Sequence, residues 1–215
     1  GGLIVVAAGD DVSYPNRVTR LVGAWKKIGY VEAVLHSDSR ILDGFVPTRA
    51  LAKPHGRNAA DLTVATYVVG GMEMPIRGQS AAYTPGLFTR FPKLREIGSI
   101  EDGPLVFRAL LIGAPIVYVE EVLLDYRVTG QNVCMGYSRS DKARTKRWLK
   151  AREYSTIQQL EDYASCGYSD KTIVGAIKKE LVRLRRSLGL ISNNPILLSV
   201  GMWSYTQGRK PADRL

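Results

Sequence analysis

The stretch of sequence that decides the fold class lies at residues 100–127 and reads IEDGPLVFRALLIGAPIVYVEEVLLDYR. Its first half predicts a helix over 104–111, because a proline suits the first turn and Gly113 follows the last apolar residues. Its second half is rich in β-branched and apolar residues and predicts two strands in quick succession, at 116–119 and 122–127. A helix that leads directly into strands is typical of an α/β domain.

The sequence upstream alternates between the same two types of element. An apolar run at residues 3–8, LIVVAA, predicts a buried strand that ends in the turn Gly9-Asp10-Asp11. The pattern between this turn and residue 100 predicts helices at 15–27, 58–69 (capped by Asn58) and 85–91, strands at 31–36 and 80–83, and a loop with one short strand at 37–57. Together these elements predict an α/β fold with a mixed sheet and flanking helices.

The character of the chain changes after Tyr137. Two long helices are predicted, at about 139–164 and 170–188, so we expect an α/β part over residues 1–137 and a helical extension over 138–215. A last apolar run at 195–205 is shorter than the ~20 residues that cross a bilayer and suits a packed or interfacial helix.

The amino-acid composition excludes several classes of protein. Of the 215 residues, 45% are hydrophobic and 23% charged, which excludes disordered and collagen-like classes. Two cysteines imply no disulfide framework and fit a reducing cytosol, and two histidines are too few for a His-rich zinc site. The chain starts at Gly1 within an apolar strand pattern, from which we expect a fragment of a longer protein.

The net charge of +10 is unevenly distributed. Residues 139–215 carry 16 Lys/Arg and 7 Asp/Glu, whereas residues 1–138 carry 14 and 13. This asymmetry indicates an anionic partner for the basic tail, such as a membrane surface, a nucleic acid or an acidic polymer. A solvated basic helix face is the alternative.

Asp10 and Asp11 form the first candidate site. They follow the opening strand, and ligands of open α/β sheets gather at the carboxyl ends of strands. Paired carboxylates there are the hard oxygen ligands that Mg²⁺ or Mn²⁺ prefers, usually with phosphate oxygens. The same residues would also suit a turn that caps the next helix.

Glu101 and Asp102 form the second candidate site, at the start of the helix over 104–111. A carboxylate at a helix N-terminus is stabilised by the macrodipole and can accept a proton from a substrate hydroxyl, although an ordinary N-cap has the same sequence. A third candidate is Arg127, which closes a strand and whose planar guanidinium matches phosphate oxygens. A surface ion pair is the alternative there.

The order and spacing of these motifs resemble those of the family-two glycosyltransferases of the GT-A fold. The resemblance is carried by IVVAAGDDVSYPNRV near the start, GQSAAYTPGLFTRF in the middle, and the segment from IEDGPLVFRALLIG to LLDYRVTGQNVC. Members of this family typically show an acidic metal motif followed by a proline, then G-x-x-x-A-Y, then E-D-x-x-L-x-x-R-A-x-x-x-G and a Y-R-x-H-G-x-N-x-S loop. The match covers about residues 3–135 and implies part of a Rossmann-like GT-A sheet.

The resemblance also implies roles for individual residues. Asp10, with Asp11 beside it, would bind a divalent metal, Mg or Mn. Asp102 would be the general base, and Glu101 would support it. The acceptor pocket would be bordered by Gly78, Gln79 and Ser80, and the donor diphosphate by Arg127 and Asn132. The chain departs from the family pattern at Ala8, where an acidic residue is frequent, at Thr129, where a histidine is frequent, and at Cys134, where a serine is frequent.

By this resemblance the chain is expected to belong to an inverting, metal-dependent transferase acting on a nucleotide-sugar donor. The acceptor would be a glycan, a lipid-linked saccharide or a cell-surface polysaccharide. The expected location is the cytoplasm, with peripheral contact to the inner face of the membrane through the basic tail. Two alternatives stay open: a non-catalytic remnant, and a basic module that binds nucleic acid or membrane. Because aromatic residues do not interleave with the basic ones, a nucleic-acid partner is not expected.

Overall fold

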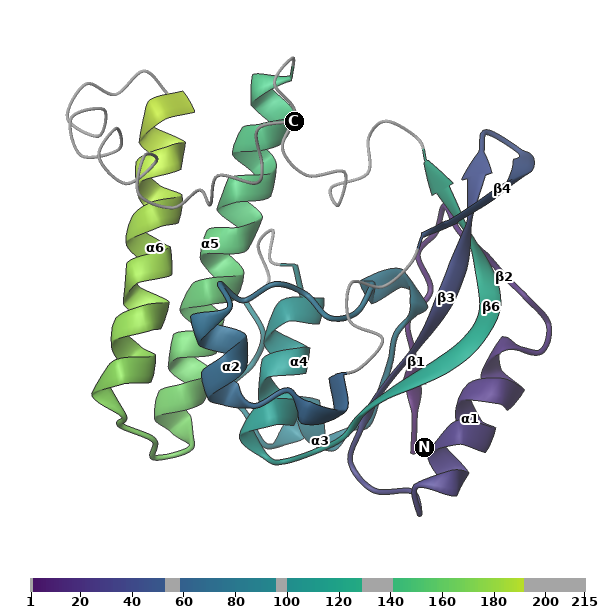
Figure 1. Cartoon of the computed structure of the whole chain (residues 1–215), viewed down its shortest axis with the longest axis horizontal. Helices are drawn as coiled ribbons and strands as arrows, with labels where there is room; N and C mark the ends of the chain where they lie inside the picture. The colour runs from purple at the N-terminus through teal and green to yellow at the C-terminus, as the bar shows by residue number, and fades with distance from the viewer. Residues whose placement is uncertain (1, 53–58, 96–99, 129–140, 192–215) are drawn as a thin grey trace.

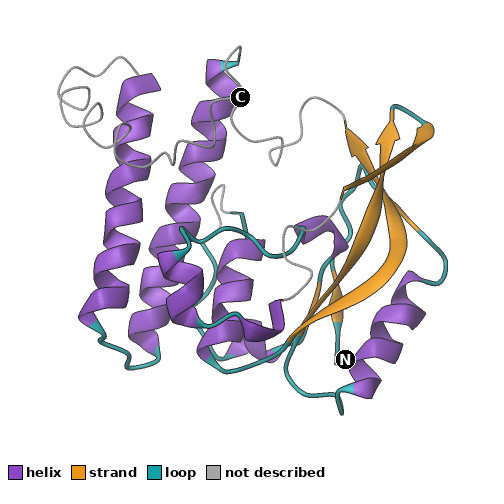
Figure 2. Cartoon of the chain, in the orientation of Figure 1, coloured by secondary structure: helices purple, strands orange, loops and turns teal. Residues whose placement is uncertain are grey.

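The computed structural model describes residues 2–52, 59–95, 100–128 and 141–191. It is a mixed α/β fold with one curled mixed sheet and flanking helices, as the sequence predicts. Figure 2 shows the strands gathered on one side of the molecule and most of the helices on the other. The sheet has the order β1-β5-β3-β6-β2, with β4 paired to β3 off this path. The strands are β1 (Ile4–Val5), β2 (Val12–Ser13), β3 (Val34–Asp43), β4 (Val46–Ala52), β5 (Ala82–Tyr83) and β6 (Ile116–Val128).

Strands β3 and β6 form the centre of the sheet. They pair in parallel from Val34 opposite Ile116 to Asp43 opposite Val128, whereas the other pairs are antiparallel. The prediction of two strands at 116–119 and 122–127 is therefore wrong, since β6 is continuous. Its register against β3 shifts near Asp38, which lets Glu120-Glu121 bulge out while the strand goes on.

The predicted loop at 37–57 is also largely wrong. Strand β3 continues to Asp43 and returns as β4 through a turn at Gly44, which has φ 61°. The sequence is misleading here because the polar side chains of β3 find partners across the sheet. The Tyr118 hydroxyl donates to Asp38 Oδ2 at 2.7 Å, and Arg40 binds both oxygens of Asp125 at 2.7 and 2.9 Å.

Helices cover both faces of the sheet (Figure 1). On one face, Leu21 of α1 (Arg17–Lys27) packs in a cluster with Leu35 and Leu123. On the other face lies the larger core, which joins Val34 and Phe107 with the remaining helices. These are α2 (Val64–Val69), α3 (Gly86–Thr89), α4 (Asp102–Leu111), α5 (Lys142–Ser165) and α6 (Lys171–Ile191), with short 3₁₀ turns η1 (Ala59–Asp61) and η2 (Gly78–Ser80).

The N-terminal caps refine the predicted helix boundaries. Helix α2 begins later than predicted, because Thr63 caps it in a capping box with Thr66; Asn58 lies outside the described residues. Asp141 caps α5 by accepting from the Arg144 amide at 2.9 Å, and Asp170 accepts from the Thr172 amide at 2.7 Å at the start of α6.

Helices α5 and α6 form an antiparallel pair that packs on the α/β part. Tyr163 and Ile177 belong to the same core as Phe107 of α4. A buried ion pair also joins α4 to α5, with Arg108 Nε 2.7 Å from Asp162 Oδ2. Within the described residues, no helix combines the length and apolarity needed to cross a bilayer. The apolar run at 195–205 lies outside those residues.

Candidate functional site

Asp102 is the first residue of α4 and is buried, with 7% of its surface exposed. Its Oδ1 accepts a hydrogen bond from the Gly103 amide at 2.9 Å. Burial, followed by the charge of Glu101, raises the pKa of this carboxyl to about 6, although the amides of Gly103 and Gly78 act in the opposite direction. Asp102 is therefore ionised at neutral pH and yet binds a proton more readily than an ordinary aspartate.

Gly78 lies directly against Asp102. A Cβ atom at this position would be 2.8 Å from Asp102 Oδ2, so only glycine permits the approach. Turn η2 therefore brings the backbone of 78–80 to the carboxylate, although more than twenty residues separate the two in sequence. This close packing places the G-x-x-x-A-Y segment next to the Glu-Asp pair.

Asp102, Gly78 and Gln79 line a pocket of about 480 Å³. The pocket lies between the segment over 72–79, the start of α4 and one side of α5. Ser80 is fully buried and its hydroxyl donates to the Arg77 carbonyl at 2.9 Å, so it holds the turn and does not line the pocket. Glu101 is exposed at the N-cap of α4 and also lies outside the lining, where its charge raises the pKa of Asp102.

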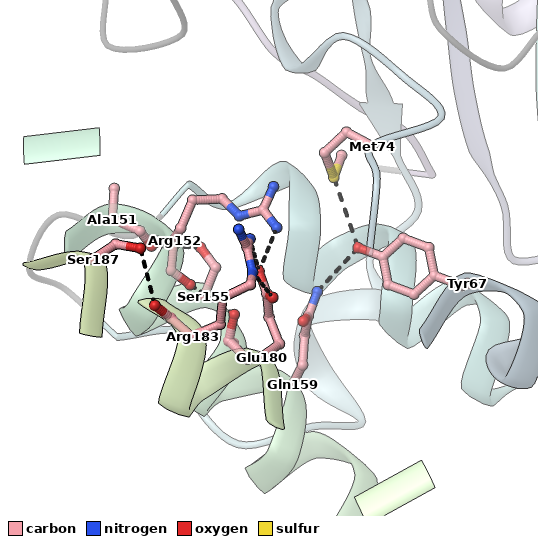
Figure 3. A network of polar contacts seen from close by, with 10 residues as sticks. Tyr67, Met74, Ala151, Arg152, Ser155, Gln159, Glu180, Arg183 and Ser187 are labelled. Carbon is pink, nitrogen blue, oxygen red and sulfur yellow. Dashed lines mark hydrogen bonds and ion pairs between the residues drawn. The ribbon is translucent and has the colours of Figure 1, made fainter. Parts of the chain in front are cut away.

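Helix α5 supplies a pocket wall that the sequence analysis missed. Its contribution is the stripe Trp148, Arg152, Ser155 and Gln159, at spacings of four, three and four residues. Gln159 Nε2 donates to the Tyr67 hydroxyl at 3.2 Å, and this hydroxyl lies 3.9 Å from the sulfur of Met74 (Figure 3). Polar residues at helical spacing, with a tryptophan among them, were the available signal.

Arg152 is held at the pocket by α6. Its guanidinium lies 5.7 Å from the centre of the Trp148 ring and binds Glu180 Oε1 at 3.1 Å. Glu180 also accepts from Arg183, at 2.6 Å between Oε1 and the Arg183 Nη2 atom (Figure 3). One buried carboxylate thus serves two guanidinium groups and holds Arg152 in place beside the pocket.

Asp10 and Asp11 form a second cluster, with Arg127. The Arg127 amide donates to Asp11 Oδ1 at 3.0 Å, and its Nε donates to the Asp10 carbonyl at 2.9 Å. The Arg127 guanidinium also stacks over the Phe45 ring, 4.4 Å from its centre. The fold therefore brings Arg127 next to Asp11 and Asp10, which are 116 and 117 positions away in sequence. Asn132, Thr129 and Cys134 lie outside the described residues.

The acidic cluster has features that suit a cation. Asp11 Oδ2 is buried without a hydrogen-bond partner, and burial, as the largest cause, raises the pKa of this carboxyl. A bound cation would satisfy that oxygen and favour the ionised form. The described residues contain no group of three or more His, Cys, Asp or Glu side chains suited to a metal, so further ligands would have to come from substrate oxygens or water. Carboxylate oxygens are donors of the type that Mg²⁺ or Mn²⁺ prefers.

Arg17 connects the two clusters and was not singled out from the sequence. It is buried, with 1% exposed, and donates from Nη1 to Ser13 Oγ and from Nη2 to the Gln79 carbonyl, both at 2.8 Å. Burial lowers the pKa of its guanidinium, while the charge of Asp11 acts in the opposite direction. One side chain therefore joins β2, which directly follows Asp11, to the pocket wall that touches Asp102.

Comparison with known proteins adds no relative. The sequence matches no protein-family model, and a search of curated proteins gives no match.

Proposed function

We propose that this chain carries the acceptor side and metal motif of an inverting, metal-dependent glycosyltransferase that uses a nucleotide-diphosphate sugar. The observation that carries the proposal is the buried carboxylate of Asp102 on the wall of a pocket of about 480 Å³. A pocket of this size suits a saccharide unit. A carboxyl whose pKa is raised to about 6 suits proton abstraction near neutral pH.

The proposed reaction is a single displacement. The acceptor hydroxyl gives its proton to Asp102 as its oxygen forms a bond to the anomeric carbon of the donor sugar. The bond from that carbon to the diphosphate breaks on the opposite face, and the nucleoside diphosphate leaves with the bonding electrons. Configuration at the anomeric carbon is inverted, and no covalent sugar–enzyme intermediate is formed.

The cluster of Asp10, Asp11 and Arg127 would receive the diphosphate. Asp10 and Asp11 would hold the divalent metal, which when bound offsets negative charge on the leaving group. Arg127 presents its guanidinium beside Asp10 and adds positive charge at the same place. Arg17 supports the relative position of this cluster and the pocket, because it bonds to Ser13 on one side and Gln79 on the other.

The acceptor class in this proposal is a glycan, a lipid-linked saccharide or a cell-surface polysaccharide. Trp148 supports a saccharide acceptor, because an indole face in a pocket packs well against the apolar face of a sugar ring. The proposed location is the cytoplasm, at the inner face of the membrane.

A panel of nucleotide sugars tests the proposal. With the full-length protein and Mn²⁺, we expect release of one nucleoside diphosphate from one donor, and loss of this release when a chelator is added. A variant with Asp10 and Asp11 both replaced by Asn is the matched control for the metal. Folded protein that releases no nucleotide from any donor would instead support the non-catalytic remnant.

The pH dependence of transfer gives a separate prediction. Asp102 acts in its ionised form, so kcat/KM should be constant above its pKa of about 6 and fall as the pH drops below that value. The expected slope on the acidic side is about tenfold per pH unit. Replacing Glu101 with Gln removes the nearby charge and should shift this limb to lower pH. If the acidic limb of the profile did not move in the Glu101→Gln variant, a group other than Asp102 would be responsible for it.

A further inference from the structure

The paired helices α5 and α6 concentrate positive charge at one end. Because the helices are antiparallel, α5 begins where α6 ends, at the end of the molecule far from α1 (Figure 1). The first turns of α5, over 142–152, carry six Lys/Arg and no Asp/Glu, and the last turns of α6, over 183–191, carry three and none. We call these two segments the basic end.

Few acidic groups offset this charge. Glu153 faces α6 and binds Arg185 at 2.6 Å, and Glu180 binds both Arg152 and Arg183. Asp141, at the N-cap of α5, is a further carboxylate at the basic end, and Glu73 and Asp102 lie with Arg152 in the lining of the pocket. The basic end therefore keeps a surplus of positive charge after its ion pairs are formed.

The lysines of α5 are arranged as a stripe. Lys142, Lys146 and Lys150 are exposed and four residues apart, so they lie one above another on the same helix face. Like charges at this spacing destabilise an isolated helix, so the arrangement has no benefit for folding. It presents a row of ammonium groups about 12 Å long to an external anion.

We infer that the basic end docks on a lipid bilayer that carries anionic headgroups. Such a surface presents many phosphates in a plane and attracts clustered Lys and Arg side chains. Docking of this kind is independent of the transferase proposal.

A bilayer fits the basic end better than a single-stranded nucleic acid does. Binding of single strands uses exposed aromatic rings among the basic residues. On the described part of the basic end, the aromatic ring is that of Trp148, which is half-buried, lies near Arg152 and lines the pocket. If the proposed function holds, docking through α5 would also bring a membrane-held acceptor close to the opening of the pocket.

Vesicle sedimentation tests the inference. The chain is mixed with vesicles of phosphatidylcholine alone, or with about 30% phosphatidylglycerol, at low and high salt. We expect binding to the anionic vesicles that weakens with salt, and little binding to the neutral ones. Replacing Lys146 and Lys150 with Gln should weaken binding about 25-fold, since each basic residue near an anionic surface contributes about fivefold.

The matched control is Lys26→Gln with Lys27→Gln. These lysines are also exposed, lie on α1 away from the basic end and carry the same total charge (Figure 1). The control should bind within about threefold of the original chain, the effect of net charge alone. Equal losses in both variants, or no binding to anionic vesicles, would overturn the inference. Tighter binding to a DNA duplex or an RNA strand than to vesicles, lost in the Lys146/Lys150 variant, would reassign the basic end to nucleic acid.

Discussion

Replacement of Asp102 by Asn should lower kcat for sugar transfer by about 10²–10⁴-fold, the range that removal of a general base produces. The amide has nearly the same shape as the carboxyl, so the pocket should keep its form. Nucleotide binding should change little, because Asp10, Asp11 and Arg127 form a separate cluster. The measurement is kcat for transfer, together with the Kd of the nucleoside diphosphate.

Stability provides the control for this variant. The pKa of Asp102 is about 6 in the folded protein and about 4 in an unfolded chain. Between these values the folded protein holds more protons, so its free energy of unfolding decreases as the pH rises from about 4 to about 6 and stays reduced at neutral pH. Asparagine has no such penalty. The Asp102→Asn variant should therefore be at least as stable as the original chain at pH 7.5, with a smaller advantage at pH 4.5.

A folded Asp102→Asn variant with near-normal turnover would exclude Asp102 as the base. Glu101→Gln is the comparison, since Glu101 is exposed and outside the pocket lining. It should affect kcat far less than Asp102→Asn. If Glu101→Gln instead lowered kcat more than Asp102→Asn, Glu101 would be the base. It would then take the proton from an acceptor hydroxyl that lies outside the pocket.

The sequence predicts the elements of this fold better than their lengths. The helix over 104–111 and the two long C-terminal helices are confirmed within a few residues, because strong apolar periodicity and clear end signals define them. Most of the errors fall on the strands. The predicted buried strand over 3–8 is reduced to Ile4–Val5, with Ile4 exposed, whereas β3 and β6 are longer than predicted. In β3, the polar side chains of Asp38 and Arg40 form hydrogen bonds with residues 80 and 85 positions away, which no local pattern reveals.

The sequence likewise predicts some residues of the candidate site and not others. Local chemistry identified Asp102 and Asp11, and the family resemblance indicated Gly78. The structure brings Gly78 into contact with Asp102 and joins Asp11 to Arg127. The sequence could not identify Arg17 as a connector, since its role depends on a bond to a carbonyl 62 positions away. Likewise, the sequence could not predict that α5 forms a wall of the pocket, because this depends on how α5 packs on α4.

Loss of the ion pair between Arg108 and Asp162 should have the largest effect on stability. The two side chains are 1% and 0% exposed, and Arg108 Nη2 makes a second bond to Asp162 Oδ1 at 3.0 Å. Replacing Asp162 with Ala leaves a buried guanidinium without its counter-charge and should lower the free energy of unfolding by about 3–5 kcal/mol. Urea denaturation followed by circular dichroism would measure this change.

Arg108 should be even harder to replace than Asp162. It also donates to the carbonyls of Leu87, at 3.0 Å, and Pro92, at 2.6 Å, and its guanidinium lies 5.0 Å from the centre of the Phe91 ring. Removal of both charges in Arg108→Met with Asp162→Leu should recover part of the stability, because no buried charge remains unpaired. It should not recover all of it, since the buried carbonyl of Leu87 and the partly buried carbonyl of Pro92 lose their donor. Full recovery of the stability would show that water molecules donate hydrogen bonds to these carbonyls in place of Arg108.

The same ion pair should also matter for the pocket. Asp102 lies on α4 and Arg152 on α5, and the pair fixes α5 to α4 ten residues further along α5. A variant of Asp162 that is still folded at low temperature should therefore bind an acceptor less well, with a raised KM, while nucleotide affinity at the separate Asp10–Arg127 cluster is retained. If KM for the acceptor and nucleotide affinity fell together, the two clusters would be coupled through Arg17 more tightly than its bonds to Ser13 and Gln79 imply.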